Sequence, residues 1–467
     1  MDERAWAVVQ TVKQFMDEVV HDARHDRPDS RAVSEVVAEH LDRDPLELPV
    51  VRLDVDPHQF VNLDVAVAAL VEENGGGSVI GVGGGEMRHH QTFGDMIQPE
   101  GSWSRFRVGT VDRERLETGP SSHRDAVTFG VHLFRYQGQP VAVHQRRASP
   151  RYGERSGLEV VAPEEICGPL LADVRRLMVE LSVFRGQLLE FGEREQTFGP
   201  GIGAISFLQR PALGADDVIL PPGALERVER HVVGGVRHRE RLVSAGQHLK
   251  RGVLLYGPPG TGKTHTVRYL VSQAPEVTAI VLAGNALSFV GAATEFAHAL
   301  QPSIVIVEDV DLIAEHREMR QGPQPLLFTL LDAIDGLTSE ADVAFVLTTN
   351  RVDLIEAALA QRPGRVDLAV EIPRPDADSR RRLVDLYAGT LPFSPAALDR
   401  TTEWTEGATA SFFKELFRRV VLTAADVDAP VSDELLDAVR DEMLADAERL
   451  TQSLLGLPRR PGGRTPG

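Results

Sequence analysis

The sequence predicts an α/β protein whose second half is built on a parallel sheet and whose first part is a separate α+β domain. Short, continuous apolar segments alternate with helical patterns after about residue 216. Their residues are mostly β-branched or aliphatic and lack the period of two that marks a half-buried strand. We therefore expect strands that are buried on both faces under helices. Before residue 205 the pattern mixes amphipathic helices with alternating strands, and after residue 377 it is helical.

Changes in composition set the expected boundaries. Glycine and proline accumulate between residues 192 and 214, which is typical of a linker. We expect an α+β N-terminal domain over 1–205, a linker over 206–215, a large α/β subdomain over 216–376, a helical subdomain over 377–452 and a basic, disordered tail over 453–467.

The N-terminal domain is expected to begin with helices joined by a connector. Asp56 and Pro57 suit the cap and the first position of a helix that runs to Glu73. The glycine-rich stretch 75–85 is not followed by the Lys-Ser/Thr pair of a phosphate loop, so we expect a flexible connector there.

Strand patterns follow in both halves of the chain. Alternating apolar residues over 127–148, with a turn at Gln137-Gly138, predict a hairpin, and a long helix is expected through 177–189. In the α/β subdomain, apolar runs predict strands over 253–256, 279–282, 304–307, 344–347 and 368–372. Apolar residues at helical spacing then predict helices around 413–420 and 435–443.

The composition restricts what the protein can bind. The 50 Lys and Arg residues are outnumbered by 69 Asp and Glu residues, so the formal net charge is −19. Such a surface repels phosphate backbones, which argues against a nucleic-acid partner. The sequence has no apolar run near the roughly 18 residues of a spanning helix and no signal-peptide pattern, and its single cysteine, Cys167, excludes an intrachain disulfide framework. We expect a cytoplasmic protein with no membrane partner.

A phosphate-binding loop follows the first strand of the α/β subdomain. Residues 257–264 match the pattern G-x-x-x-x-G-K-[ST] between an expected strand and an expected helix. The glycines let backbone N–H groups converge on the phosphates, while Lys263 reaches the β- and γ-phosphates and Thr264 offers its hydroxyl to Mg²⁺. We therefore expect ATP and Mg²⁺ as cofactors, bound by Gly257, Pro258, Pro259, Gly260, Thr261, Gly262, Lys263, Thr264 and His265.

Two carboxylates follow the expected strand 304–307. Adjacent acids where a buried strand ends are costly unless a cation or a water uses them. We expect Glu308 to hold Mg²⁺ together with Thr264, and Asp309 to orient and activate the attacking water. The alternative is that the two acids only cap a strand at the surface.

These motifs resemble those of the AAA ATPases of the AAA+ superfamily, over about residues 216–450. Thr348-Thr349-Asn350 is similar to the family's sensor-1 segment, which implies that Asn350 positions the water and detects the γ-phosphate. Arg362-Pro363-Gly364-Arg365 is similar to its second region of homology, which implies that Arg362 and Arg365 reach the nucleotide of a neighbouring subunit. The resemblance implies a P-loop AAA+ module with helices on both faces of the sheet and a C-terminal helical lid.

Two positions depart from the family pattern. Most members end this acid-tipped strand motif, known as Walker B, in Asp-Glu, whereas this chain has Glu308-Asp309, an order similar to that of the mitochondrial Rieske-protein AAA translocase. Aspartate is one methylene shorter than glutamate, so the water must sit closer or turnover is slower. In the lid, Ala410-Ser411 replaces the family's Gly-Ala pair, and we assign both residues to the adenine contact.

The resemblance also implies what hydrolysis drives. Phe289-Val290-Gly291 lies where AAA unfoldases carry an aromatic–hydrophobic–Gly pore loop, and a large apolar ring can grip a polypeptide without selecting its sequence. The alternative for Phe289 is a core side chain at the start of a helix. Arginines that act on a neighbour need a head-to-tail interface, and such interfaces can close into rings. We expect a homo-hexameric, ATP-hydrolysing protein unfoldase or remodelling chaperone whose N-terminal domain recognises a protein substrate or adaptor.

Other functions are less consistent with the sequence. A nucleotide-gated assembly protein would hold a partner without threading it, and this alternative stays open. A DNA-translocating motor is disfavoured by the net charge. The sequence contains no His-Glu-x-x-His zinc-protease motif, and Thr465-Pro466-Gly467 lacks the hydrophobic-Tyr-x ending of proteasome-docking rings, so we expect no fused zinc protease of that type and no proteasome docking through the tail.

Overall fold

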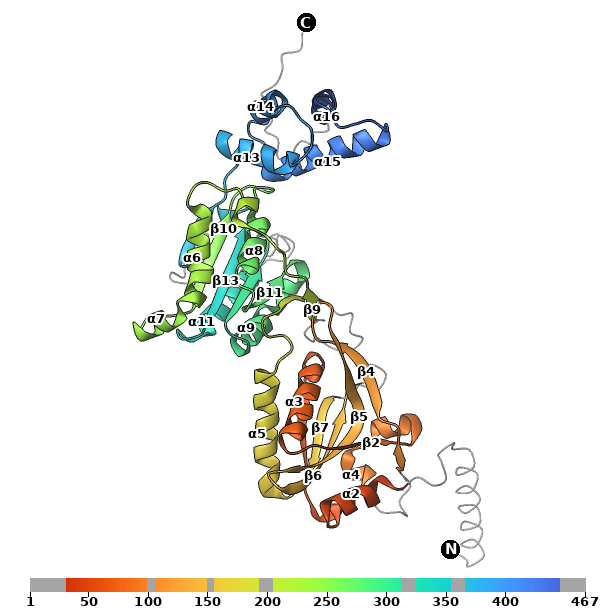
Figure 1. The fold of residues 1–467 in the computed structure, drawn as a ribbon. Coiled ribbons are helices and arrows are strands. Elements are labelled where there is room, and N and C mark those ends of the chain that lie inside the picture. The colour runs from red at the N-terminus through yellow and green to blue at the C-terminus, as the bar shows by residue number, and fades with distance from the viewer. Residues whose placement is uncertain are drawn as a thin grey trace, which may run out of the picture. The chain divides into compact units, whose positions relative to one another are not determined.

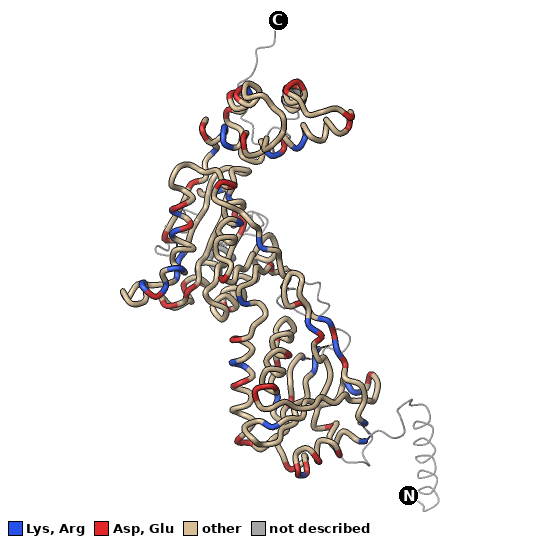
Figure 2. The backbone as a smooth tube through the Cα atoms, in the orientation of Figure 1, with Lys and Arg blue, Asp and Glu red and all other residues tan. Residues whose placement is uncertain are grey.

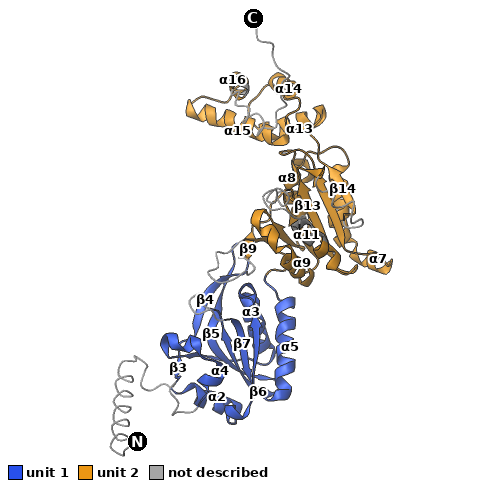
Figure 3. Cartoon of the chain, turned by 180° about the vertical axis from the view of Figure 1, so that it is seen from behind, with its two compact units in different colours: residues 1–183 blue, residues 184–467 orange. Residues whose placement is uncertain are grey.

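The computed structural model describes residues 31–98, 106–148, 155–192, 205–311, 325–353 and 366–445 (Figure 1). The chain divides into two compact units, Met1–Val183 and Phe184–Gly467 (Figure 3). The division falls earlier than the expected boundary at residue 205. The tail 453–467 and the arginines Arg362 and Arg365 lie outside the described residues. In the part that is described, no helix is long and apolar enough to cross a membrane.

In the described residues, the first unit is a seven-stranded antiparallel sheet with helices on both faces. Its seven strands are β1 (Val50–Val55), β2 (Gly77–Val82), β3 (Val108–Gly109), β4 (Asp112–Glu117), β5 (His123–Tyr136), β6 (Gln139–Arg146) and β7 (Ser156–Val161). They follow the order β1-β7-β6-β5-β2-β3, and β4 also pairs with β5. Its helices are α2 (Val33–Leu41), α3 (Phe60–Glu73), α4 (Phe93–Met96) and α5 (Glu164–Glu180), with short 3₁₀ turns η1 (Pro45–Glu47), η2 (Pro57–Gln59) and η3 (Gly85–His90). One core lies between the sheet and α3 and α5, and a second between the sheet and α2 and α4.

The expected hairpin is confirmed as β5 and β6. Tyr136 pairs with Gln139, so the turn has two residues, and both Gln137 (φ 51°) and Gly138 (φ 82°) have the positive φ that a tight hairpin turn needs. Figure 2 shows acidic and basic positions interspersed along the described backbone, and β4 itself alternates the two signs from Asp112 to Arg115.

The expected connector at 75–85 is wrong, because Gly77–Val82 forms β2, which lies between β5 and β3 in the first sheet. The glycines there allow close approach of other backbone. A Cβ at Gly81 would lie 2.0 Å from the carbonyl oxygen of Thr110, and one at Gly77 would lie 2.6 Å from that of Leu133. Glycine in this stretch therefore marks crowding between strands rather than a flexible segment.

The second unit contains the expected parallel sheet. The five predicted strands are β10 (Arg251–Tyr256), β11 (Thr278–Leu282), β12 (Ser303–Val307), β13 (Val343–Thr349) and β14 (Leu368–Glu371). They run parallel in the order β14-β10-β13-β12-β11. Helices α6 (Ala224–Arg237) and α8 (Lys263–Ser272) pack on one face, and α9 (Val290–Ala299) and α11 (Pro325–Gly336) cover the other (Figure 1).

Two further strands extend this sheet beyond β11. Strand β8 (Leu188–Phe191) pairs parallel with β11, and β9 (Ile205–Leu208) pairs antiparallel with β8. The expected helix through residue 189 is therefore wrong after Glu180, where α5 ends, and the expected linker 206–215 contains part of a strand. The rings of Phe184 and Phe191 lie 5.3 and 5.7 Å from that of Phe296 in α9, so aromatic contacts hold the segment around β8 against the rest of the unit.

The remaining elements of the second unit are helical. They are η4 (Ala215–Asp217), α7 (Arg239–Ser244), η5 (Gly284–Phe289), α13 (Ala377–Ala388), α14 (Pro395–Trp404), α15 (Ala410–Asp426) and α16 (Asp433–Ala445). The last four enclose a core of their own, and the two helices predicted around 413–420 and 435–443 are α15 and α16.

Candidate nucleotide site

The parallel sheet brings three chain segments to one edge. Strands β10, β13 and β12 are neighbours, so the residues that follow them, Gly257, Asn350 and Glu308, lie at the same edge of the sheet. The loop 257–262 leaves β10 there and leads into α8, whose first residue is Lys263. The expected strand–loop–helix context of the phosphate loop is confirmed.

Two glycines of this loop are required by its geometry. Gly257 has φ 147°, and a Cβ there would lie 2.2 Å from the carbonyl oxygen of Ile372. Gly260 has φ 75°, and a Cβ there would lie 2.3 Å from Ser411 Oγ. Any side chain at either position would collide with a neighbour in a backbone conformation that L-residues rarely adopt.

Lys263 is buried at the centre of the site. It is 6% exposed, and its Nζ donates to the carbonyl oxygens of Gly257 and Pro258, both at 2.9 Å, and to Asn350 Oδ1 at 2.7 Å. Burial lowers the pKa of Lys263, whereas the nearby carboxylates of Asp309 and Asp311 oppose that shift. The ammonium is thus held among oxygen atoms at a place where anionic phosphate oxygens can replace them.

Asn350 links the lysine to the second acid of the acidic pair. Its Nδ2 donates to Asp309 Oδ1 at 3.3 Å, while its Oδ1 accepts from Lys263. Asp309 has a positive φ of 49°, which is uncommon for a residue with a side chain and is frequent at functional sites. The structure therefore brings three predicted site residues, Lys263, Asn350 and Asp309, into one chain of contacts.

Glu308 faces the start of α8 instead. Burial raises the pKa of Glu308, and the negative charge of Asp309 raises it further. A hydrogen bond from the Thr264 side chain opposes this shift. A hydroxyl and a carboxylate side by side are the hard oxygen donors that Mg²⁺ prefers, so Thr264 and Glu308 fit that cation.

The remaining nucleotide-site residues surround the loop. His265 Nε2 lies 3.0 Å from the carbonyl oxygen of Asp217, which ties α8 to the segment before α6. Ser411 N donates to the carbonyl oxygen of Gly260 at 3.1 Å, so the start of α15 contacts the phosphate loop. Ala410 is the first residue of α15. The expected adenine contact of Ala410 and Ser411 stays a prediction.

The predicted pore-loop triplet lies at the junction of η5 and α9. Phe289 is half-buried, whereas Val290 is 1% exposed and begins α9 together with Gly291. Of these three residues, only Phe289 presents a partly accessible apolar side chain. The glycine lies within a helix here rather than acting as the hinge of a loop.

Sequence reasoning missed Asp311, which is buried beside these groups. Its Oδ1 accepts from Thr349 Oγ1 at 2.8 Å and from Asn350 N at 3.1 Å. A signal was present, because Asp311 is the third acid after β12. Its partners, however, belong to the end of another strand, since Thr349 is the last residue of β13 and Asn350 follows it.

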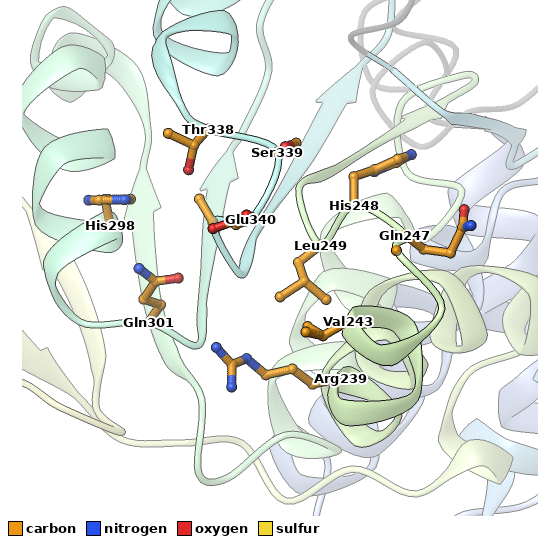
Figure 4. A pocket seen from close by; sticks show the side chains of 12 residues that line it. Arg239, Val243, Gln247, His248, Leu249, His298, Gln301, Thr338, Ser339 and Glu340 are labelled. Carbon is orange, nitrogen blue, oxygen red and sulfur yellow. The ribbon is translucent and has the colours of Figure 1, made fainter.

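A cavity of about 610 Å³ lies at the opposite edge of the sheet (Figure 4). Its lining includes Leu249, Gln301 and Ala341, which precede β10, β12 and β13. Arg251, the first residue of β10, and Asp342, which follows Ala341 in the chain, form a buried ion pair at 2.8 Å. The phosphate loop leaves β10 at the other end, so this cavity is separate from the nucleotide site.

Comparison with known proteins agrees with this geometry. Residues 253–374 match the family described as "ATPase family associated with various cellular activities (AAA)". The chain is 29% identical over 262 residues to proteasome-activating nucleotidase 2 of Halobacterium salinarum, covering 52% of this chain and 59% of that protein. It is 31% identical to 26S protease regulatory subunit 6A of Caenorhabditis elegans, over 40% of this chain and 46% of that one. It is 30% identical to the ATP-dependent zinc metalloprotease FtsH of a Synechococcus species, over 74% of this chain and 58% of the relative. In these three comparisons the chain spans about half the length of each relative.

Proposed function

Because this chain carries an ATPase domain of the AAA family, we propose that the whole protein couples ATP hydrolysis to the unfolding or remodelling of other proteins. The observation that carries the proposal is the contact chain from Lys263 through Asn350 to Asp309, at 2.7 and 3.3 Å. It joins a phosphate-binding cation to a carboxylate that can take a proton from water.

Each residue of the site has a separate proposed role in hydrolysis. Lys263 exchanges its loop carbonyls for phosphate oxygens and so stabilises negative charge that develops there. Thr264 and Glu308 would hold Mg²⁺, and the bound cation would supply positive charge that neutralises the phosphates. Asp309 accepts a proton from the attacking water, and the Asn350 amide holds the Asp309 carboxylate in place.

The arginines are proposed to act on a neighbouring copy in a hexameric ring. This proposal rests on the similarity of Arg362-Pro363-Gly364-Arg365 to the family's second region of homology. A planar, permanently charged guanidinium is suited to stabilising the negative charge that develops on a transferring phosphoryl group.

A polypeptide is the proposed substrate. The names of the relatives associate them with the proteasome or with proteolysis, and Phe289 offers a partly exposed aromatic ring next to the nucleotide site's sheet edge. The first unit is proposed to recognise the substrate or an adaptor, and the cytoplasm is the proposed location.

The test is a trap experiment. Asp309→Asn loaded with ATP should retain a bound polypeptide that wild type releases after hydrolysis, and mass spectrometry of the captured protein then names the substrate. Phe289→Ala should keep its ATPase activity and lose unfolding of that captured protein. If Phe289→Ala processes the substrate at the wild-type rate, threading is wrong and the protein instead holds its partner in a nucleotide-gated assembly.

A further inference from the structure

Two neighbouring strand ends are joined by hydrogen bonds at the nucleotide site. Asp309 N donates to Thr348 Oγ1 at 3.0 Å, and Val310 N donates to the Thr348 carbonyl oxygen at 3.0 Å. Asp311 Oδ1 then accepts from Thr349 Oγ1 at 2.8 Å and from Asn350 N at 3.1 Å. These four hydrogen bonds join residues 309–311, which include the proposed base, to residues 348–350, which include Asn350. We call this set of contacts the junction.

Asp311 is the centre of this junction. It is 5% exposed, and Thr349 is fully buried, so their hydrogen bond is shielded from water. One carboxylate oxygen receives both donors, and a carboxylate acceptor makes shorter and stronger hydrogen bonds than a neutral one. The backbone of Asn350 therefore cannot shift without breaking a charge-assisted bond.

The position of the Asn350 backbone decides where its side chain lies. That side chain has one contact on each end, Lys263 Nζ at 2.7 Å and Asp309 Oδ1 at 3.3 Å. A displacement of about 1 Å at a reacting group can cost on the order of 100-fold in rate. Asp311 touches neither the lysine nor the base directly through a hydrogen bond, yet it holds the residue that contacts both.

We propose that Asp311 is a positioning residue for ATP hydrolysis, which acts by holding Asn350 through Thr349 Oγ1 and the Asn350 backbone N–H. This inference rests on the proposed ATPase function. It predicts an effect on the turnover of bound ATP and little effect on the affinity for ATP, because the phosphate loop and α8 make no hydrogen bond to Asp311 in the described residues.

A matched pair of substitutions separates positioning from stability. Thr349→Val removes the 2.8 Å hydroxyl–carboxylate bond to Asp311, together with the bond that the same hydroxyl accepts from Arg351 N at 3.0 Å, and keeps the shape of the side chain. Tyr269→Phe removes a similar bond, from Tyr269 Oη to Glu229 Oε2 at 2.7 Å, on a buried residue of the same unit. Both variants lose one hydroxyl donor, but only the first lies in the junction.

The measurements are kcat, the Kd for ATP and the melting temperature of the full chain. We expect Thr349→Val and Asp311→Ala to lower kcat about 10-fold or more with Kd within about threefold, while Tyr269→Phe keeps the kcat of wild type. In combination with Asn350→Ala, Thr349→Val should add no further loss, because both changes remove the same function.

Four results separate the possible failures. Wild-type kcat in Thr349→Val and Asp311→Ala would overturn the role of Asp311, and so would a full additional loss in the Thr349→Val/Asn350→Ala double variant. An equal loss of kcat in Tyr269→Phe would mean that Thr349→Val acts only through stability. If wild type itself binds ATP but does not hydrolyse it, the proposed function fails instead.

Discussion

Replacing Asp309 with asparagine removes a negative charge while leaving the surrounding contacts in place. An amide oxygen at the position of Oδ1 still accepts from Asn350 Nδ2 at 3.3 Å, and the backbone N–H still donates to Thr348 Oγ1 at 3.0 Å. Asparagine also tolerates the positive φ of 49° at this position better than most residues do. The substitution should therefore remove proton acceptance alone.

The expected loss follows from that role. A positioned general base contributes about 10²- to 10⁴-fold to a rate, which is about 3 to 5 kcal/mol in activation free energy. The affinity for ATP should stay the same or rise, because the substitution removes one anion from the neighbourhood of Lys263. Single-turnover hydrolysis and fluorescent-nucleotide binding measure the two quantities separately. Turnover within about threefold of wild type would refute the role of Asp309 as base. Loss of ATP binding would show that the charge of Asp309 is needed for binding, against this account.

Two further predictions concern stability. Burial raises the pKa of Glu159, but hydrogen bonds from His144, Arg52 and the Phe93 N–H outweigh it and lower the pKa from 4.5 to about 2. The ionised Glu159 carboxylate therefore stabilises the folded state fully above about pH 5, and this stabilisation is lost as the pH falls towards 2. The first unit should lose about 3 kcal/mol over that range, and denaturant unfolding of Glu159→Gln should show no such loss. Arg251→Met should cost about 3 kcal/mol in thermal or denaturant unfolding, because it removes one of the two cations at the buried carboxylate of Asp342 and leaves Arg239 Nε at 3.4 Å as the other; Arg251→Met/Asp342→Leu should recover part of the loss. A flat pH profile in wild type, or a double variant as unstable as the single one, would contradict these accounts.

The sequence predicted the centre of the second unit well because its motifs combine local spacing with strand pattern. The five strands β10 to β14 are continuous apolar runs, and Gly257 to Thr264 follow one of them directly, so neighbouring residues carry the whole signal. Parallel pairing then brings Glu308, Asp309 and Asn350 to the same edge without further information.

The errors arose where distant contacts decide the local structure. Leu188–Phe191 continues an apolar pattern after α5, and only pairing with β11 makes it a strand. The glycines of 77–82 lower the propensity for strand, yet the crowding at Gly81 requires them. Asp311 was missed for the same reason, because its partner Thr349 lies 38 residues further along the chain.

The most direct test of the central claim is the hydrolysis of ATP by the full chain in the presence of Mg²⁺. The buried ammonium of Lys263, held by three oxygen atoms at 2.7 to 2.9 Å, is the cation that the phosphates need. Wild type should release phosphate at a rate that saturates with ATP, and Lys263→Ala should lose both tight nucleotide binding and turnover. Equal binding and turnover in Lys263→Ala would contradict the assignment of the site.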